Sequence, residues 1–252
     1  MAVPWSLVTF DIDGTLTTRH GWWPIAQALG KLPDYNRTNR ALRSGRETED
    51  VHLEKLFALA TGVSRSRFEA LLAASPRVAG IEETVRSLRA EGTHVALLSH
   101  NAGPVLDWYR RAFGFEAGSG GWGLAYADGH VAAPREVRAD KVRGLADLAA
   151  RFRVPYRSIC HVGDAWPDAR LAPILGGFVA FNPKGEAVAE VADAVVRGRD
   201  LRRVVPVLER LVPRRPVKGA RPLAESSNTA NGAARASGGW STSSWKRSTR
   251  SG

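Results

Sequence analysis

The sequence predicts an α/β protein with a doubly wound parallel sheet and a small all-helical insertion. Short apolar runs rich in strand formers alternate with helical patterns, which is typical of a parallel sheet with helices on both faces. Between the first and second of these runs, residues 17–76 show helical patterns only. We therefore expect an α/β core formed by residues 1–16 and 77–212, with the helical insertion between them.

The first strand and the insertion follow from local patterns. The apolar run that starts at Leu7 ends at Phe10 and reads as a buried parallel strand. Within the insertion, Ser64 is placed to cap a helix that runs to Ala74. Three further helical segments are expected at Pro24–Leu29, Tyr35–Arg43 and Asp50–Ala60.

The second half of the chain alternates helix and strand. A helix that stops at Gly92 precedes a strand near residues 94–99. We interpret the glycine-rich stretch 118–123 as a plain connection, and Asp128–Gly129 as the turn of a hairpin. A further helix is expected at 137–152, and further strands at 158–162, 178–181 and 194–196.

Polar residues follow several of the predicted strands. Asp11 and Asp13 come directly after the first strand, and open α/β sheets place their chemistry at the carboxyl ends of strands. A calcium loop that begins at Asp11 would need Gly at its sixth position and Glu at its twelfth, but these are Leu16 and Trp22. The two aspartates are therefore expected at the mouth of a site.

Three later segments add to this pair. The second strand ends at Ser99, Lys141 lies near the start of a helical pattern, and Asp164 and Asp168 follow another strand. The order Asp-x-Asp, Ser, Lys, Asp-x-x-x-Asp resembles the four motifs of the haloacid dehalogenase superfamily, in its phosphoserine phosphatase-like subgroup. The resemblance covers roughly residues 5–210 and implies a Rossmann-like core with a small helical cap at 17–76.

The resemblance assigns a role to each acidic residue. Asp11 attacks phosphorus and forms an aspartyl-phosphate, while Asp13 protonates the leaving oxygen and then activates water. Asp11, Asp13 and Asp164 hold Mg²⁺, and Asp168 supports the metal shell and positions Lys141. Carboxylates beside a dianionic phosphate require a cation; Mg²⁺ suits oxygen ligands, and the absence of paired His or Cys nearby argues against zinc.

The phosphate-binding residues are expected at Ser99, His100, Asn101 and Lys141, again from the resemblance. The residues themselves leave plainer alternatives open. Asp164 and Asp168 would also suit helix caps, Ser99 a turn at a strand end, and Lys141 a solvated helix position. His161 is expected to pack or hydrogen-bond locally.

The chain departs from the subgroup near its cap. The subgroup usually has a glutamate nine residues after the nucleophile, where it meets the substrate ammonium; here the residue is His20. Two glycines usually follow the motif serine, but here His100 and Asn101 follow it. We therefore expect a substrate other than phosphoserine, selected by His20 and by two neighbours, Arg19 and Trp22.

These observations favour a Mg²⁺-dependent phosphomonoester hydrolase that acts on a small phosphorylated metabolite. One alternative is a phosphotransferase of the same superfamily, which passes the phosphoryl group from Asp11 to an alcohol. Another is a non-catalytic binder of anions or nucleic acid that uses a basic tail. The sequence leaves the oligomeric state open.

Charge and composition bear on partners. Residues 213–252 carry eight Lys or Arg and one Glu, which is most of the net charge of +11. This tail is poor in aliphatic residues, so we expect it to be disordered, and nucleic acid is expected as a partner only through it. No apolar run approaches the ~18 residues of a membrane span. The single cysteine excludes an intrachain disulfide, and a cytoplasmic location is expected.

Overall fold

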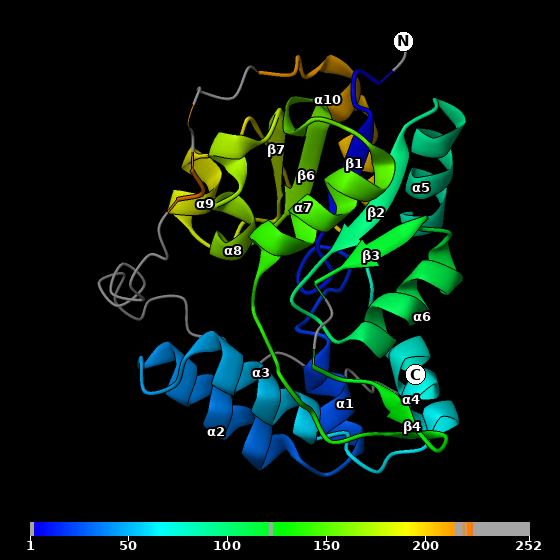
Figure 1. The fold of residues 1–252 in the computed structure, drawn as a ribbon, viewed down its shortest axis with the longest axis vertical. Helices are drawn as coiled ribbons and strands as arrows, with labels where there is room; N and C mark the ends of the chain where they lie inside the picture. The colour runs from blue at the N-terminus through cyan, green and yellow to red at the C-terminus, as the bar shows by residue number, and fades with distance from the viewer. Residues whose placement is uncertain (1–2, 121–122, 215–218, 220, 224–252) are drawn as a thin grey trace, which may run out of the picture.

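The fold is a six-stranded parallel sheet with helices on both faces, as the sequence predicts. The computed structural model describes residues 3–120, 123–214, 219 and 221–223. The strand order is β3-β2-β1-β6-β7-β8, and every neighbouring pair in this sheet is parallel (Figure 1). The strands of the sheet are β1 (Leu7–Phe10), β2 (His94–Leu98), β3 (Ala117–Ser119), β6 (Ile159–Gly163), β7 (Gly177–Phe181) and β8 (Ala194–Val196).

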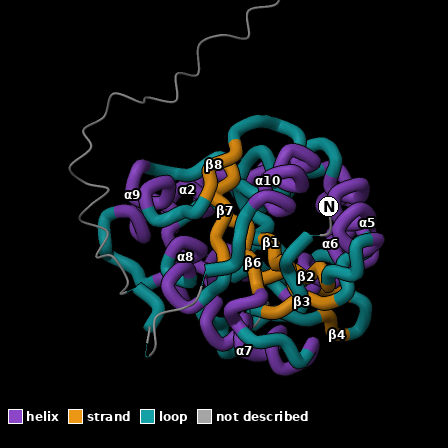
Figure 2. The backbone as a smooth tube through the Cα atoms, turned by 90° about the horizontal axis from the view of Figure 1, so that it is seen from above, coloured by secondary structure: helices purple, strands orange, loops and turns teal. Residues whose placement is uncertain are grey.

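Helices cover the two faces of this sheet. α5, α6 and α10 lie on one face, and α7 and α8 lie on the other (Figure 2). All residues of β1, β6 and β7 are buried, which explains why these strands read as mostly apolar runs. The helices of this part are α5 (Ile81–Ala90), α6 (Gly103–Phe113), α7 (Lys141–Phe152), α8 (Trp166–Ala169), α9 (Glu186–Glu190) and α10 (Val205–Arg210), with short 3-10 turns at Tyr156–Ser158, Ala172–Ile174 and Leu201–Val204.

Four helices between β1 and α5 form a separate layer below the sheet (Figure 1). Ser64 caps the last of them, because its hydroxyl accepts a hydrogen bond from the backbone N–H of Arg67 at 3.4 Å, as predicted. This layer lies beyond the carboxyl ends of the strands. Its helices are α1 (Trp22–Ala28), α2 (Leu32–Arg43), α3 (Glu49–Ala58) and α4 (Arg65–Ala74).

The predicted hairpin is present and lies against this helical layer. Its strands are β4 (Tyr126–Ala127) and β5 (His130–Val131), and the turn residues Asp128 and Gly129 have φ of 47° and 74°, as a type I′ turn requires. The backbone N–H of Gly62 donates to the carbonyl of Val131 at 2.9 Å. A segment from the second half of the chain thus pairs with the insertion.

Two segments of the second half of the chain differ clearly from the sequence prediction. The helix expected from residue 137 begins at Lys141, because the Asp140 carboxylate accepts a hydrogen bond from the N–H of Arg143 at 2.9 Å and caps it. The stretch 118–123, expected as a plain connection, contributes to the edge strand β3. A Cβ atom at Gly118 would lie 3.2 Å from Leu106, so the glycine lets α6 approach this strand closely.

Residues after α10 return to the core, unlike the expected disordered tail from residue 213. The guanidinium of Arg214 donates to the carbonyl of Ala172 at 2.5 Å and lies 3.3 Å from the Asp193 carboxylate. The backbone N–H of Leu223 donates to the carbonyl of Arg170 at 3.0 Å. The rest of the predicted tail, residues 215–218, 220 and 224–252, lies outside the described residues. In the described part of the chain, no helix has the length and apolarity needed to cross a bilayer.

Candidate active site

The carboxyl ends of the central strands meet at one edge of the sheet. Phe10 of β1 pairs in register with Leu97 of β2 and with Val162 of β6. The residues that follow these positions include Asp11, Ser99 and Asp164. Parallel register therefore brings together three of the predicted site residues from three separate segments.

Lys141 joins two buried carboxylates. Its Nζ atom donates to Asp11 Oδ1 at 2.7 Å and also to Asp168 Oδ1. All three residues are buried. Burial alone would lower the pKa of Lys141, but Asp11 and Asp168 raise it above its usual value, so the amine stays charged. The alternative of a solvated Lys141 is wrong.

Asp168 holds Lys141 in place. Its Oδ1 atom also accepts a hydrogen bond from His161 Nε2 at 2.8 Å, and His161 Nδ1 lies 2.8 Å from Thr9 Oγ1. Its Oδ2 atom accepts from the backbone N–H groups of Asp164 and Ala165 at 3.1 and 3.0 Å. Burial would raise the pKa of Asp168, but Lys141 and His161 hold it below its usual range. Asp168 thus serves as a helix cap and also holds Lys141 in position.

Asp164 lies at the position expected for a metal ligand. Carboxylate oxygens of Asp11, Asp164 and Asp168 lie within 4.8 Å of one another. Burial, with the neighbouring Asp11 and Asp168 carboxylates, raises the pKa of Asp164 to about 7 despite an opposing contribution from Lys184. A buried carboxyl group that lies close to two other carboxylates and has a raised pKa fits a site for a hard cation such as Mg²⁺.

Lys184 approaches the same point. Its Nζ atom lies 2.7 Å from Asp164 Oδ2 and donates to the backbone carbonyl of Asp13 at 3.3 Å. Gly14 makes this approach possible: it has φ of +99°, and a Cβ atom there would lie 2.1 Å from Asp164 Oδ2. The oxygens of Asp13 and Asp164 therefore already share one cation, which is consistent with a cation site between them.

The Asp13 carboxylate is fixed by both layers of the protein. Its Oδ1 atom accepts from the N–H of Gly21 at 2.6 Å, and its Oδ2 atom accepts from Asn101 Nδ2 at 3.0 Å. Asn101 Oδ1 in turn accepts from the indole N–H of Trp22 at 3.0 Å. Asn101 therefore positions Asp13 and connects it to the helical layer, which the sequence did not indicate.

A cavity of about 150 Å³ lies over these residues. Ser99 and His100 line it, and the Ser99 hydroxyl accepts a hydrogen bond from the N–H of Asn101 at 3.3 Å. The side of the cavity formed by the helical layer includes His20 and Trp22. It is thus enclosed by both layers of the protein.

The three residues expected to select the substrate are placed differently from one another. His20 lines the cavity, and its buried Nδ1 atom has no hydrogen-bond partner among the described residues. Trp22 packs in the helical layer, with its ring centroid 5.3 Å from that of Phe57. Arg19, in contrast, lies outside the lining of the cavity, and its guanidinium stacks on the ring of Trp23, 4.7 Å from the ring centroid.

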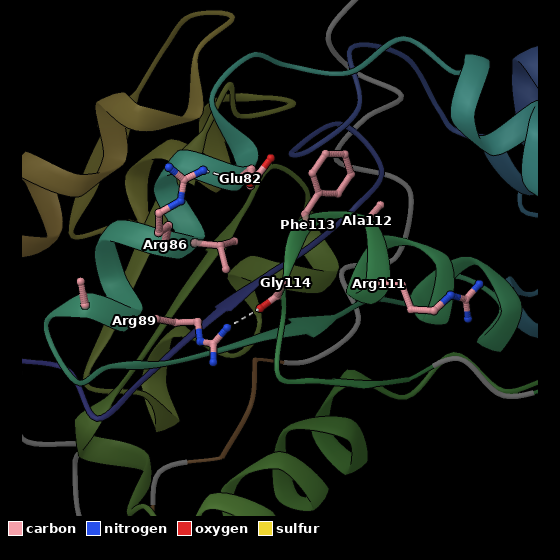
Figure 3. A pocket seen from close by; sticks show the side chains of 9 residues that line it. Glu82, Arg86, Arg89, Arg111, Ala112, Phe113 and Gly114 are labelled. Carbon is pink, nitrogen blue, oxygen red and sulfur yellow. Dashed lines mark hydrogen bonds and ion pairs between the residues drawn. The ribbon is translucent and has the colours of Figure 1, made fainter.

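A larger cavity of about 600 Å³ lies between α5 and α6 (Figure 3). Its arginines are already engaged: Arg86 pairs with Glu82 at 2.9 Å, and Arg89 donates to the carbonyl of Gly114 at 3.2 Å. None of the clustered aspartates lines it. The smaller cavity, which Asp11, Asp13 and Asp168 line, is therefore the candidate site.

Comparison with known proteins agrees with this geometry. A family model of haloacid dehalogenase-like hydrolases matches residues 5–176. The chain belongs to this family. The hydrolase is 25% identical over 208 residues to the phosphoserine phosphatase of Archaeoglobus fulgidus, an alignment that covers 81% of this chain and 60% of that relative. It is 23% identical to the phosphoserine phosphatase of Methanocaldococcus jannaschii, over 79% of this chain and 95% of that one.

Solved structures share the fold of the hydrolase. A phospho-aspartyl intermediate analogue of phosphoserine phosphatase superposes with a TM-score of 0.65 at 22% identity, over 80% of this chain and 98% of that chain. A haloacid dehalogenase family hydrolase from Salmonella enterica serovar Typhi superposes with a TM-score of 0.72 at 17% identity, over 81% and 71%. At these identities the likeness shows the fold alone.

Two charged residues at the site of the hydrolase were not expected from its sequence. Lys184 follows strand β7 at the same edge as the aspartates, so the rule that located Asp11 would also have found it. Glu49 lines the cavity from α3, and no local pattern marks it.

Proposed function

We propose that the protein is a Mg²⁺-dependent phosphatase that hydrolyses a small phosphate monoester through an aspartyl-phosphate on Asp11. In this proposal residues 17–76 form a cap over a core of residues 1–16 and 77–212. The observation that carries the proposal is the buried Lys141 ammonium shared between Asp11 and Asp168. Such a group holds a carboxylate nucleophile in place and offsets its repulsion of a dianionic phosphate.

Asp11 needs no general base. A carboxylate oxygen is itself a nucleophile, and Asp11 faces the cavity at the end of β1. One oxygen is bonded to Lys141, which leaves the other to attack phosphorus. The oxygen–phosphorus bond to Asp11 forms as the bond to the leaving alcohol breaks.

Asp13 serves as the acid and then the base. Asn101 and Gly21 hold its two oxygens, so the carboxyl group has a fixed orientation two residues from the nucleophile. It donates a proton to the leaving oxygen and later accepts one from the water that hydrolyses the intermediate. Asn101 is a positioning residue for this step.

The metal would be held by oxygen atoms of Asp11, Asp13 and Asp164. When bound, it supplies charge that draws the phosphoryl oxygens into the cluster of carboxylates. The donor set is all oxygen, which suits Mg²⁺ better than zinc. Asp168 has its two oxygens engaged by four donors, which supports a positioning role rather than a direct ligand role.

The cavity limits the size of the substrate. A volume of about 150 Å³ holds a phosphoryl group and a leaving group of a few heavy atoms. Two relatives are named phosphoserine phosphatases, which are enzymes for a substrate of this size. His20 replaces the glutamate that would meet an ammonium group, so we propose a small ester other than phosphoserine as the preferred substrate.

Replacing the nucleophile tests the proposal. Asp11→Asn should lower kcat by roughly a thousandfold or more, because an amide of nearly the same shape is a poor nucleophile. Activity would be measured with Mg²⁺ against a panel of small phosphate esters. Asp107→Asn, at an exposed position of α6, is the control and should retain activity. Substantial turnover by Asp11→Asn would exclude the aspartyl-phosphate.

A further inference from the structure

A carboxylate of the helical layer contacts a histidine of the core beside the candidate site. Glu49 is the first residue of α3, and His100 follows β2. The distance between Glu49 Oε1 and His100 Nδ1 is 2.7 Å. The two residues lie 51 positions apart in the sequence and belong to different layers, so the contact exists only when the layers are together.

The other ring nitrogen of His100 is left for a ligand. His100 Nε2 is buried and has no hydrogen-bond partner among the described residues. His100 lines the cavity together with Ser99, Lys141 and Asp11. A buried polar atom without a partner destabilises the protein, so a site with such an atom favours a ligand that bonds to it.

We propose that Glu49 is a positioning residue that fixes the His100 imidazole so that Nε2 donates a hydrogen bond to a phosphoryl oxygen of the substrate. This inference rests on the proposed function, because it assumes a phosphate ester in the cavity. With both ring nitrogens protonated, His100 would donate to the Glu49 carboxylate from Nδ1 and to a phosphoryl oxygen from Nε2. Closure of the helical layer then completes the phosphate site.

The pKa of Glu49 is consistent with this pairing. Burial alone would raise the pKa of this carboxyl group, but the hydrogen bond and charge of His100 hold it below its usual value. Glu49 is thus a carboxylate when the contact forms, and it can accept the hydrogen bond from His100 Nδ1.

The neighbouring residue offers a matched control. Asp50 also joins the two layers, since its Oδ1 atom accepts a hydrogen bond from the N–H of Ala139 at 2.7 Å. Unlike Glu49, it is not among the residues that line the cavity of about 150 Å³. A variant at Asp50 therefore weakens a contact between the layers without removing the hydrogen bond between Glu49 and His100.

The test compares Glu49→Gln with Asp50→Asn in two measurements. Calorimetry with Mg²⁺ gives the affinity of each variant for inorganic phosphate. Kinetics with a small phosphate ester give KM and kcat. Glu49→Gln should weaken phosphate binding and raise KM by roughly tenfold, with kcat changed much less. Asp50→Asn should change phosphate affinity less than about twofold. In a His100→Ala background, Glu49→Gln should have no further effect.

A spectroscopic readout makes the test independent of turnover. A proton on Nδ1 shared with a carboxylate gives a low-field NMR signal, which should be present in the parent protein and in Asp50→Asn and absent in Glu49→Gln. Unchanged phosphate affinity in Glu49→Gln, an equal loss in Asp50→Asn, or additive effects with His100→Ala would each overturn the inference.

These failures differ from failure of the proposed function. If the parent protein hydrolyses phosphate esters while Glu49→Gln binds phosphate as well as it does, only the role of Glu49 is wrong. If the parent protein neither binds phosphate nor hydrolyses esters, the proposed function is wrong and this inference falls with it.

Discussion

At the scale of single residues, the active-site lysine depends on a chain of buried polar groups. Asp168 holds Lys141, His161 holds Asp168, and Thr9 holds His161. Thr9 and His161 are fully buried in the central strands β1 and β6, so each polar atom needs its partner. The expectation that His161 bonds locally is confirmed, and its partner is a residue of the proposed machinery.

Thr9→Val tests this chain of contacts. Valine has nearly the shape of threonine but leaves His161 Nδ1 unpaired, so the free energy of unfolding should fall by about 1–3 kcal/mol. Denaturation in urea measures the loss. Thr84→Val is the control, because the Gly80 carbonyl that bonds to the Thr84 hydroxyl also accepts the backbone N–H of Thr84. Equal losses in the two variants would contradict the prediction.

At the scale of elements, the helical layer has its own buried polar contact between α2 and α3. His52 Nδ1 lies 3.1 Å from Thr38 Oγ1, and the Thr38 hydroxyl donates to Glu47 at 2.9 Å. Burial, together with the nearby His20, lowers the pKa of His52 from 6.5 to about 4. His52 therefore stays neutral at neutral pH and keeps the two helices together.

The depressed pKa of His52 predicts a loss of stability in acid. The unfolded chain takes up a proton near pH 6.5 but the folded protein only near pH 4, so stability is complete above pH 6.5 and is lost as the pH falls toward 4. The slope should be about 1 kcal/mol per pH unit in this window. Urea denaturation between pH 7 and 4.5 should show a smaller slope for His52→Asn. Parallel pH profiles for the two proteins would rule out this role.

At the scale of the whole molecule, residues near the end of the described chain contact residues that lie far earlier in the sequence. Residues after α10 return to the β7 side of the core, where Arg214 bonds to Ala172 and Leu223 bonds to Arg170. Contacts of the described residues with the core therefore extend beyond residue 213.

Two truncations test these contacts. Removal of residues 224–252 should leave the Tm unchanged, since their composition is too poor in aliphatic residues to add to a core. Removal of residues 213–252 should lower the Tm by a few degrees, because the hydrogen bonds of Arg214 and Leu223 are lost. Calorimetry of the two shortened proteins measures the Tm of each. The prediction is wrong if both have the Tm of the full chain.

The sequence by itself determined the fold class and the positions of Asp11, Ser99, Lys141 and Asp164 along the chain. Strands and helices leave local periodicities, and parallel strands must end at a common edge, so residues at strand ends were expected to meet. The hairpin turn and the Ser64 cap were predictable for the same reason, because neighbours in sequence form them.

Only the tertiary structure decided which distant residues touch. Lys184 reaches Asp13 across 171 positions, and Glu49 reaches His100 across 51. Arg19, one residue from His20, turns instead to Trp23. Such contacts depend on how closely whole layers pack and on which side chains remain free to extend. The packing of the layers and the reach of the side chains produce no periodic pattern in the sequence, because both are determined only when the whole chain folds.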